Sequence, residues 1–161
     1  MNIYLIGMPG CGKSSVGMAL SNEIGYIYVD LDKYIEEKNN MSIPKIFEAF
    51  GEKKFRELER EALIDFSYHD SYVISCGGGI INNKANKELM NGKVVYINVS
   101  LDILKDRIEN DKANIRPMFK TKTIEELWNE RKDKYEYFKD VEVLNININD
   151  AVSDIKKELG L

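Results

Sequence analysis

A glycine-rich turn that follows a short apolar run carries the clearest chemistry in the sequence. Residues 7–14 read GMPGCGKS and match the pattern G-x-x-x-x-G-K-[ST] of phosphate-binding loops. In such a turn, backbone N–H groups converge on phosphate oxygens at the N-terminus of the next helix. Lys13 can reach the outer phosphates, and the Ser14 hydroxyl can bind Mg²⁺. The pattern predicts a nucleotide site whose phosphate-binding residues are Gly10, Cys11, Gly12, Lys13, Ser14 and Ser15.

Two carboxylates follow the second apolar segment, residues 26–29. Because side chains two residues apart on a strand point the same way, we expect Asp30 and Asp32 to face the mouth of the phosphate loop. Asp30 can hold Mg²⁺, directly or through water, and Asp32 can take a proton from an acceptor hydroxyl. The alternative is structural, since Asp32 would also make a good N-cap for a helix over 33–38.

Three consecutive glycines, Gly77, Gly78 and Gly79, follow the apolar segment 72–75. Glycine loses more backbone entropy on folding than any other residue, so stability does not explain the run. Either the backbone packs unusually close to a partner, or its N–H groups face a ligand; a flexible turn is the alternative. Since parallel sheets bind ligands at the carboxyl ends of their strands, we favour a ligand nearby.

Three arginines are further candidates. In the helical segment 53–66, the spacing of Arg56 and Glu59 lets the carboxylate orient the guanidinium, although a solvated, salt-bridged helix has the same pattern. Arg131 lies in a similarly charged helical segment. Arg116 precedes a proline in an aperiodic polar stretch, which we interpret as a mobile lid over phosphates at about 110–122.

The elements that must position these residues alternate along the chain, which predicts an α/β fold: a parallel sheet with helices on both faces. We expect one domain over 1–161, with a substrate-binding segment at about 32–62. The predicted strands are 2–6, 26–29, 72–75, 93–98 and 141–146, and the predicted helices are 14–24, 32–38, 43–49, 53–66, 83–91, 101–109, 123–137 and 150–159.

Composition limits the partners. The net charge of −4 gives no basic surface for nucleic acid or an anionic membrane. The first apolar run is too short for a signal peptide or a membrane span, and we expect no membrane association. The two cysteines have no metal-ligand spacing and the chain has one histidine, so we expect neither a zinc site nor a disulfide scaffold. We expect a monomeric protein in the reducing cytoplasm.

Taken together, these motifs resemble the shikimate kinases, small relatives of the nucleoside monophosphate kinases, over nearly the whole chain. Each motif beyond the phosphate loop is weak alone, but all occur in the order found in that family. The matching segments are the phosphate loop 7–14, Asp30-x-Asp32, Phe55-Arg56-x-x-Glu59, Ser75-x-Gly77-Gly78-Gly79, Arg116-Pro117 and Arg131-x-x-x-Tyr135.

The resemblance implies a three-layer α/β/α fold with a five-stranded parallel sheet and a mobile lid. It implies transfer of the γ-phosphoryl group of ATP to the 3-hydroxyl of shikimate, a step toward chorismate and the aromatic amino acids. Arg56 and Arg131 would clamp the substrate carboxylate beside the amides of 77–79. Asp32 would bind ring hydroxyls and act as the base, Lys13 and Arg116 would neutralise the transferred group, and Ser14 and Asp30 would hold Mg²⁺.

The chain departs from the family in two places. A second basic residue early in the lid has only Lys112 or Arg107 as candidates, and the base-contacting stretch 145–150 lacks an arginine that some relatives have. Two alternatives stay open: another small-molecule kinase, such as a gluconate kinase, and a catalytically silent binding module. Against the silent module, Lys13, Asp32 and Arg56 are all present.

Overall fold

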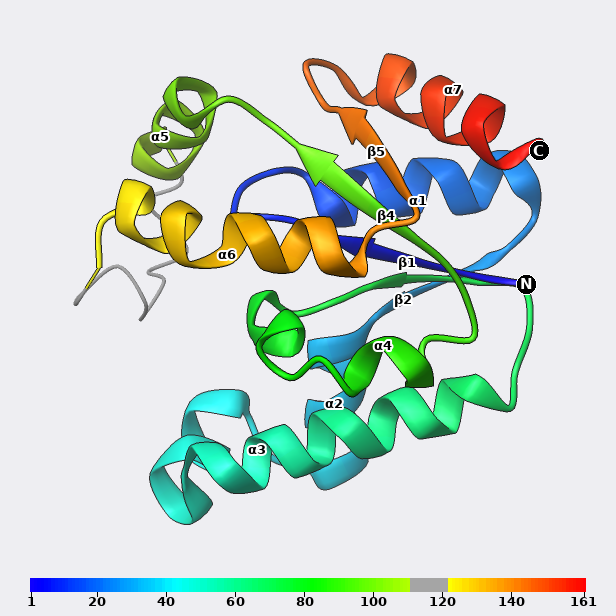
Figure 1. Cartoon of the computed structure of the whole chain (residues 1–161). Helices are drawn as coiled ribbons and strands as arrows, with labels where there is room; N and C mark the ends of the chain where they lie inside the picture. The colour runs from blue at the N-terminus through cyan, green and yellow to red at the C-terminus, as the bar shows by residue number, and fades with distance from the viewer. Residues whose placement is uncertain (111–121) are drawn as a thin grey trace.

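A five-stranded parallel sheet forms the centre of the molecule, with strand order β2-β3-β1-β4-β5 (Figure 1). The computed structural model describes residues 1–110 and 122–161. The strands are β1 (Asn2–Ile6), β2 (Ile27–Asp30), β3 (Tyr72–Ser75), β4 (Gly92–Asn98) and β5 (Val141–Leu144). The predicted parallel α/β fold is therefore confirmed, with strand ends shifted by one or two residues.

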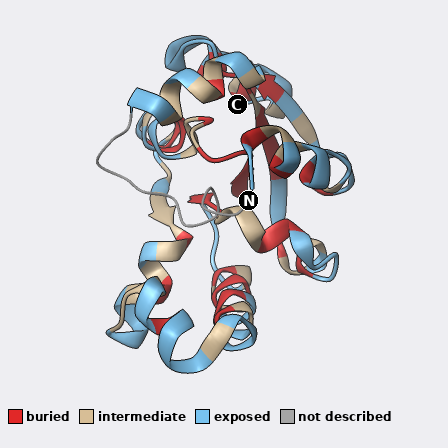
Figure 2. Ribbon diagram, turned by 90° about the vertical axis from the view of Figure 1, so that its left-hand side faces the viewer, coloured by how far each residue is buried: buried red, intermediate tan, exposed pale blue. Residues whose placement is uncertain are grey.

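Helices cover both faces of this sheet. Helices α1 (Lys13–Ile24) and α7 (Ile148–Leu159) pack together on one face, and α6 (Ile124–Phe138) lies on the other (Figure 1). All five residues of β1 are buried, as its apolar sequence requires of a strand covered on both sides. Buried positions follow the strands and the inner sides of the helices (Figure 2). Within the described residues, no helix is long and apolar enough to cross a membrane.

Helices α2 (Leu31–Asn39) and α3 (Ile43–Ser67) pack on one another below the sheet in Figure 1. The sequence predicted two helices over 43–49 and 53–66. The structure joins them into α3, broken at Gly51, whose φ of 84° and ψ of 173° are not helical. This backbone conformation is open almost only to glycine, so Gly51 fixes the bend.

Some predicted helix boundaries were wrong. The helix expected over 83–91 is shorter than predicted: only α4 (Asn86–Leu89) forms there, after a 3₁₀ turn, η1 (Gly78–Asn82). Helix α7 starts two residues early, because the Asn147 side chain accepts a hydrogen bond from the N–H of Asp150. Helix α5 (Leu101–Asn110) follows β4 as expected.

The strand order places the site. The chain leaves β1 toward the edge strand β2, returns to β3, and then crosses to β4 on the other side of β1. Neighbouring strands whose connections diverge in this way leave a crevice at their carboxyl ends, where α/β sheets bind ligands. The phosphate loop follows β1 and the three glycines follow β3. The fold therefore brings these two segments to the same crevice.

Candidate active site

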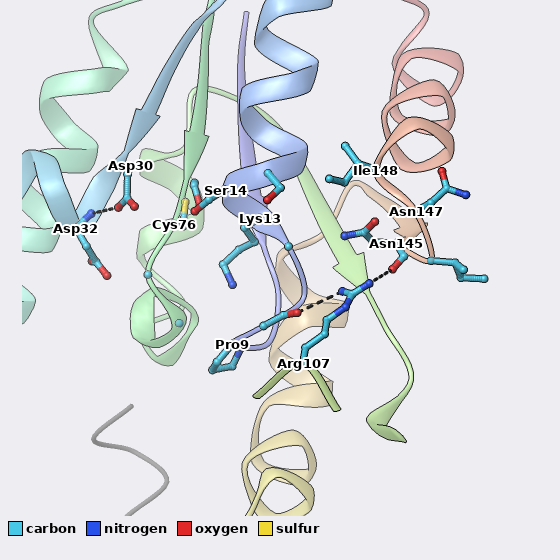
Figure 3. A pocket seen from close by; sticks show the side chains of 17 residues that line it. Pro9, Lys13, Ser14, Asp30, Asp32, Cys76, Arg107, Asn145, Asn147 and Ile148 are labelled. Carbon is cyan, nitrogen blue, oxygen red and sulfur yellow. Dashed lines mark hydrogen bonds between the residues drawn. The ribbon is translucent and has the colours of Figure 1, made fainter. Parts of the chain in front are cut away.

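A cavity of about 880 Å³ opens at this crevice, between the phosphate loop, the ends of β2 and β3, and the segment after β5 (Figure 3). Among the predicted site residues, those that line it are Gly10, Gly12, Lys13, Ser14, Ser15, Asp30, Asp32, Gly77 and Gly78. Cys11, Gly79, Arg56 and Arg131 do not line it. Arg131 instead packs against Gly78, which lines the cavity, and Arg56 packs against Gly79.

The phosphate loop is held from outside by two side chains. Arg107 donates hydrogen bonds to the carbonyl oxygens of Gly10 and Cys11, both at 3.3 Å, and Asn145 Nδ2 donates to the Cys11 carbonyl at 2.7 Å. Gly12 has a φ of 95°, and a Cβ atom there would lie 2.3 Å from Asn145 Nδ2. These contacts engage the loop carbonyls, while the first N–H groups of α1 have no partner within the helix.

Two residues of the loop are engaged within it. Cys11 is buried, and its N–H donates to the Met8 carbonyl at 3.1 Å. Lys13 Nζ donates to the carbonyl oxygens of Gly7 at 2.8 Å and Met8 at 3.2 Å. The ammonium group thus rests on the loop at the edge of the cavity, where a bound anion can draw it away.

The two aspartates lie beside the loop, but not as strand neighbours (Figure 3). Asp30 ends β2, and its Oδ1 caps α2 by accepting hydrogen bonds from the N–H groups of Asp32 at 3.0 Å and Lys33 at 3.3 Å. Asp32 lies in the first turn of α2. The argument from strand alternation was therefore wrong, and so was the alternative that Asp32 is the N-cap, yet both carboxylates line the cavity.

Asp32 is the carboxyl group whose properties suit proton transfer. Burial and the neighbouring charge of Asp30 raise the pKa of Asp32 to about 6, against the opposing effect of Lys13. Its Oδ1 is buried and has no hydrogen-bond partner in the described part of the chain. A carboxylate with a pKa near neutrality, aimed into a phosphate-binding cavity, is a candidate general base.

Each of the three glycines leaves room for a different polar side chain. A Cβ atom at these positions would lie within 3 Å of a side-chain nitrogen or oxygen. The pairs are Gly77 with Asp32 (2.7 Å to Oδ1), Gly78 with Arg131 (2.7 Å to Nη1) and Gly79 with Arg56 (2.3 Å to Nη2). Close packing, one of the two explanations drawn from the sequence, is therefore confirmed, and the run gathers the predicted acceptor-site residues around one turn.

Glu59 orients Arg56, as its spacing predicted. Arg56 Nη1 donates to Glu59 Oε1 at 3.0 Å, and a longer contact of 3.5 Å joins Nη2 to the exposed Glu52. Glu59 is only 1% exposed, and burial raises its pKa to about 7 although Arg56 favours the ionised form. The guanidinium is thereby held by a buried carboxylate on one side and faces Gly79 on the other.

Arg131 is the more unusual of the two arginines. It is 7% exposed, and no carboxylate in residues 1–110 or 122–161 forms an ion pair with it. Its Nη1 has no hydrogen-bond partner in the same residues. Because a buried charge is costly unless it is paired, Arg131 marks a place for an anion.

The far end of the cavity suits a flat ring. Arg107 Nη2 donates to the Asn145 carbonyl at 3.0 Å, and Arg107 lines the cavity together with Ile146 and Ile148. A guanidinium plane next to aliphatic side chains can stack on a purine base. The sequence left Arg107 only as an alternative to Lys112, because nothing in the pattern of α5 signals a contact nearly a hundred residues away. Lys112 and Arg116 lie outside the described residues.

The residues present fit a magnesium ion that arrives with a nucleotide. The Ser14 hydroxyl and the Asp30 carboxylate line the same cavity, and only one Asp30 oxygen is engaged in capping α2. Where the structure describes the chain, no three His, Cys, Asp or Glu residues gather as a metal cage. Mg²⁺ usually keeps several waters and binds one or two protein groups plus phosphates, which matches this donor set.

Comparison with known proteins agrees with this geometry. The family model for shikimate kinase matches residues 9–159. A shikimate kinase from Sulfurihydrogenibium sp. is 43% identical over 152 residues, covering 92% of this chain and 87% of the relative. The 1.7 Å crystal structure of shikimate kinase from Bacteroides thetaiotaomicron has a TM-score of 0.88 at 31% identity, covering 100% of this chain and 99% of its own. Shikimate kinase from Acinetobacter baumannii, solved in complex with shikimate, has a TM-score of 0.87 at 30% identity, covering 99% and 93%.

The family model spans every residue that lines the cavity, from Pro9 in the phosphate loop to Ile148 at the start of α7. The relatives match over most of their own length as well, so the resemblance concerns whole enzymes rather than a shared nucleotide-binding part. This chain therefore belongs to the shikimate kinase family.

Proposed function

We propose that this protein transfers the γ-phosphoryl group of ATP to the 3-hydroxyl of shikimate, giving ADP and shikimate 3-phosphate. The observation that carries this proposal is that the phosphate loop, Asp32 and the glycine turn line one cavity, while two arginines, Arg56 and Arg131, pack against that turn. The product would feed chorismate and aromatic amino acid biosynthesis. A shikimate-bound relative with the same fold supports the choice of acceptor.

On the acceptor side, Arg56 and Arg131 bind the shikimate carboxylate. Two guanidinium groups packed against neighbouring glycines offer planar forks that match a carboxylate in charge and geometry. The backbone of residues 77–79 contacts the ring of the substrate. This arrangement fixes the acceptor with its 3-hydroxyl toward the phosphate loop, which supplies the positioning that phosphoryl transfer chiefly needs.

Asp32 takes the proton of the 3-hydroxyl as that oxygen attacks the γ-phosphorus. The new O–P bond forms while the bond from phosphorus to the bridging oxygen of ADP breaks, and the proton stays on the Asp32 carboxyl group until the products leave. A pKa of about 6 keeps Asp32 ionised at neutral pH while leaving it basic enough to accept the proton.

On the donor side, the phosphate-loop amides and Lys13 bind the phosphates, and Arg116 neutralises charge on the transferred group. Mg²⁺ would be held by Ser14 directly and by Asp30 through water, and it would neutralise charge on the β- and γ-phosphates. Arg107 and the segment 145–148 bind the adenine ring. We propose that the enzyme works as a monomer in the cytoplasm, with no nucleic-acid or membrane partner.

The first test is ADP release by purified protein with Mg-ATP, comparing shikimate, gluconate, AMP and no acceptor. Turnover that requires shikimate is the expected result. Turnover with gluconate or AMP instead would retain the phosphate-loop chemistry and remove the acceptor roles of Arg56, Arg131 and residues 77–79. ATP binding without turnover on any acceptor would favour the silent binding module.

A further inference from the structure

Tyr135 and Arg131 lie one turn apart on the inner side of α6. Both are buried, at 1% and 7% exposed, and spacing of four residues puts two side chains next to each other on a helix. The ring of Tyr135 stacks on Tyr96 of β4, with ring centres 4.6 Å apart and planes 11° from parallel. This stacking fixes the tyrosine ring, and with it the place of the hydroxyl.

The Arg131 guanidinium lies close enough to the Tyr135 hydroxyl to influence it. Burial raises the pKa of Tyr135 above its usual range, and Arg131 opposes that rise through its charge and through hydrogen bonding. The hydroxyl and Arg131 Nη1 are nonetheless both buried, and neither forms a hydrogen bond with another group of the described residues. Site contacts are often long or poorly aligned until a ligand docks, and both groups still have an unused hydrogen-bonding capacity.

The two arginines of the acceptor site are thus held in different ways. Arg56 is oriented by the Glu59 carboxylate, an ion pair that cancels part of the field its charge would exert on a ligand. Arg131 has no carboxylate partner in the described residues, and its neighbour Tyr135 is a neutral phenol. A phenol oxygen can accept a hydrogen bond from a guanidinium without reducing its charge.

We propose that Tyr135 is a positioning residue, whose neutral hydroxyl orients the buried Arg131 guanidinium while leaving its positive charge for the carboxylate of the acceptor. This inference rests on the proposed role of Arg131 in substrate binding. The two arginines then have separate roles. Arg56 offers the acceptor carboxylate a fixed fork of N–H donors, and Arg131 offers a positive charge that no carboxylate of the described residues neutralises.

The test compares two conservative variants of the stacked pair, Tyr135→Phe and the control Tyr96→Phe. Each keeps its ring and loses one hydroxyl; that of Tyr96 contacts Asn98 rather than an arginine. Calorimetric titration should show shikimate binding about tenfold weaker in Tyr135→Phe, the scale of one hydrogen bond to a charged group. Binding of Mg-ATP should stay unchanged, and Tyr96→Phe should bind both ligands normally.

Thermal unfolding separates positioning from packing. Because Tyr135→Phe removes a buried hydroxyl without a full partner, its melting temperature should be equal to or above that of the wild type. A lower melting temperature, together with equal losses for shikimate and Mg-ATP, would overturn the inference and make Tyr135 a packing residue. Unchanged shikimate binding in Tyr135→Phe would overturn it as well.

A third variant and a second ligand separate this inference from the proposed function. Arg131→Gln should abolish shikimate binding; if it does not, the carboxylate clamp itself fails. The methyl ester of shikimate, which lacks the negative charge, should bind wild type and Tyr135→Phe with equal affinity. A tenfold difference that persists with the ester would show that Tyr135 acts on the ring hydroxyls and not through Arg131.

Discussion

At the scale of single residues, the three glycines after β3 shape the acceptor side because they have no side chains. Each missing Cβ leaves room for one side chain, and the three side chains have different proposed roles. A methyl group added at one position therefore displaces one function. The backbone tolerates the change at Gly79, because its φ lies outside the left-handed region.

Gly79→Ala should raise the KM for shikimate by about tenfold while leaving the KM for ATP unchanged. The added methyl group would meet the Arg56 guanidinium at 2.3–2.6 Å and push it out of its fork geometry. Steady-state kinetics with each substrate varied in turn checks this. The comparison is Gly77→Ala, whose methyl group meets Asp32 instead and should lower kcat. Identical kinetic defects in the two variants would contradict the one-glycine, one-function interpretation.

Asp32→Asn should lower kcat by about 10²–10⁴-fold, because the amide cannot accept the proton. In the wild type, kcat should rise with pH through about 6 as Asp32 ionises and reach a plateau above it. In Asp32→Asn, kcat should be low and should not change with pH over this range. A wild-type profile that is flat from pH 5 to 8 would argue against Asp32 as the base.

The same substitution should stabilise the protein at neutral pH. The pKa of Asp32 is raised from 3.8 to about 6 on folding, so the folded state binds the proton more tightly and loses stability as pH rises through this window. Removing the ionisable group should increase the free energy of unfolding at pH 8 by up to about 3 kcal/mol, and by almost nothing below pH 4. Chemical denaturation at the two pH values measures the difference.

At the scale of elements, the bend in α3 links the substrate-binding segment to Arg56. Gly51 breaks the helix, and Arg56 follows in the second turn after the break. Gly51→Ala should destabilise the protein by about 1–3 kcal/mol, because alanine has to adopt a strained backbone or straighten the helix. No atom lies within 4 Å of the added methyl group, so the effect comes from the backbone alone.

Denaturant unfolding and the KM for shikimate together check this. If the bend positions Arg56, Gly51→Ala should raise the KM for shikimate as well as lower stability. Lower stability with an unchanged KM would mean that the bend matters for folding only.

The elements were mostly predictable, because apolar runs and helical spacing decide them locally. The strands of the sheet and the phosphate loop follow from residues adjacent in the sequence. The argument that Asp30 and Asp32 are neighbours on one strand failed because Asp30 caps α2 and Asp32 lies in the first turn of that helix. Hydrophobic periodicity carries no information about which of two nearby aspartates supplies the cap.

At the scale of the whole molecule, the sequence was least informative where a contact joins distant segments. Glu59 was a candidate partner for Arg56 because the two are three residues apart. Nothing in the sequence pairs Gly78 with Arg131, or the phosphate loop with Arg107, since these contacts depend on how α5 and α6 pack on the sheet. The resemblance to a family pointed to Arg131 as a substrate-binding residue, and only the structure showed the contacts of Arg107.

Arg107 ties together three parts of the donor side: α5, the phosphate loop and the segment after β5. Its guanidinium donates to the carbonyls of Gly10 and Cys11 and to that of Asn145. In this way it fixes the loop carbonyls, and it lines the cavity together with the segment 145–148, where we propose that the base binds. Arg107→Met keeps most of the unbranched stem of the side chain and removes every hydrogen bond of the guanidinium.

Arg107→Met should raise the KM for ATP by about tenfold or more, since two or three hydrogen bonds from a charged group are lost. The KM for shikimate should not change, because Arg56 and Arg131 bind the acceptor from the other side of the cavity. The matched control is Lys105→Met on the same helix, which removes a surface ion pair with Glu125 and should leave both constants unchanged. If Arg107→Met weakened both substrates equally, Arg107 would be needed for the shape of the whole crevice rather than for the nucleotide end.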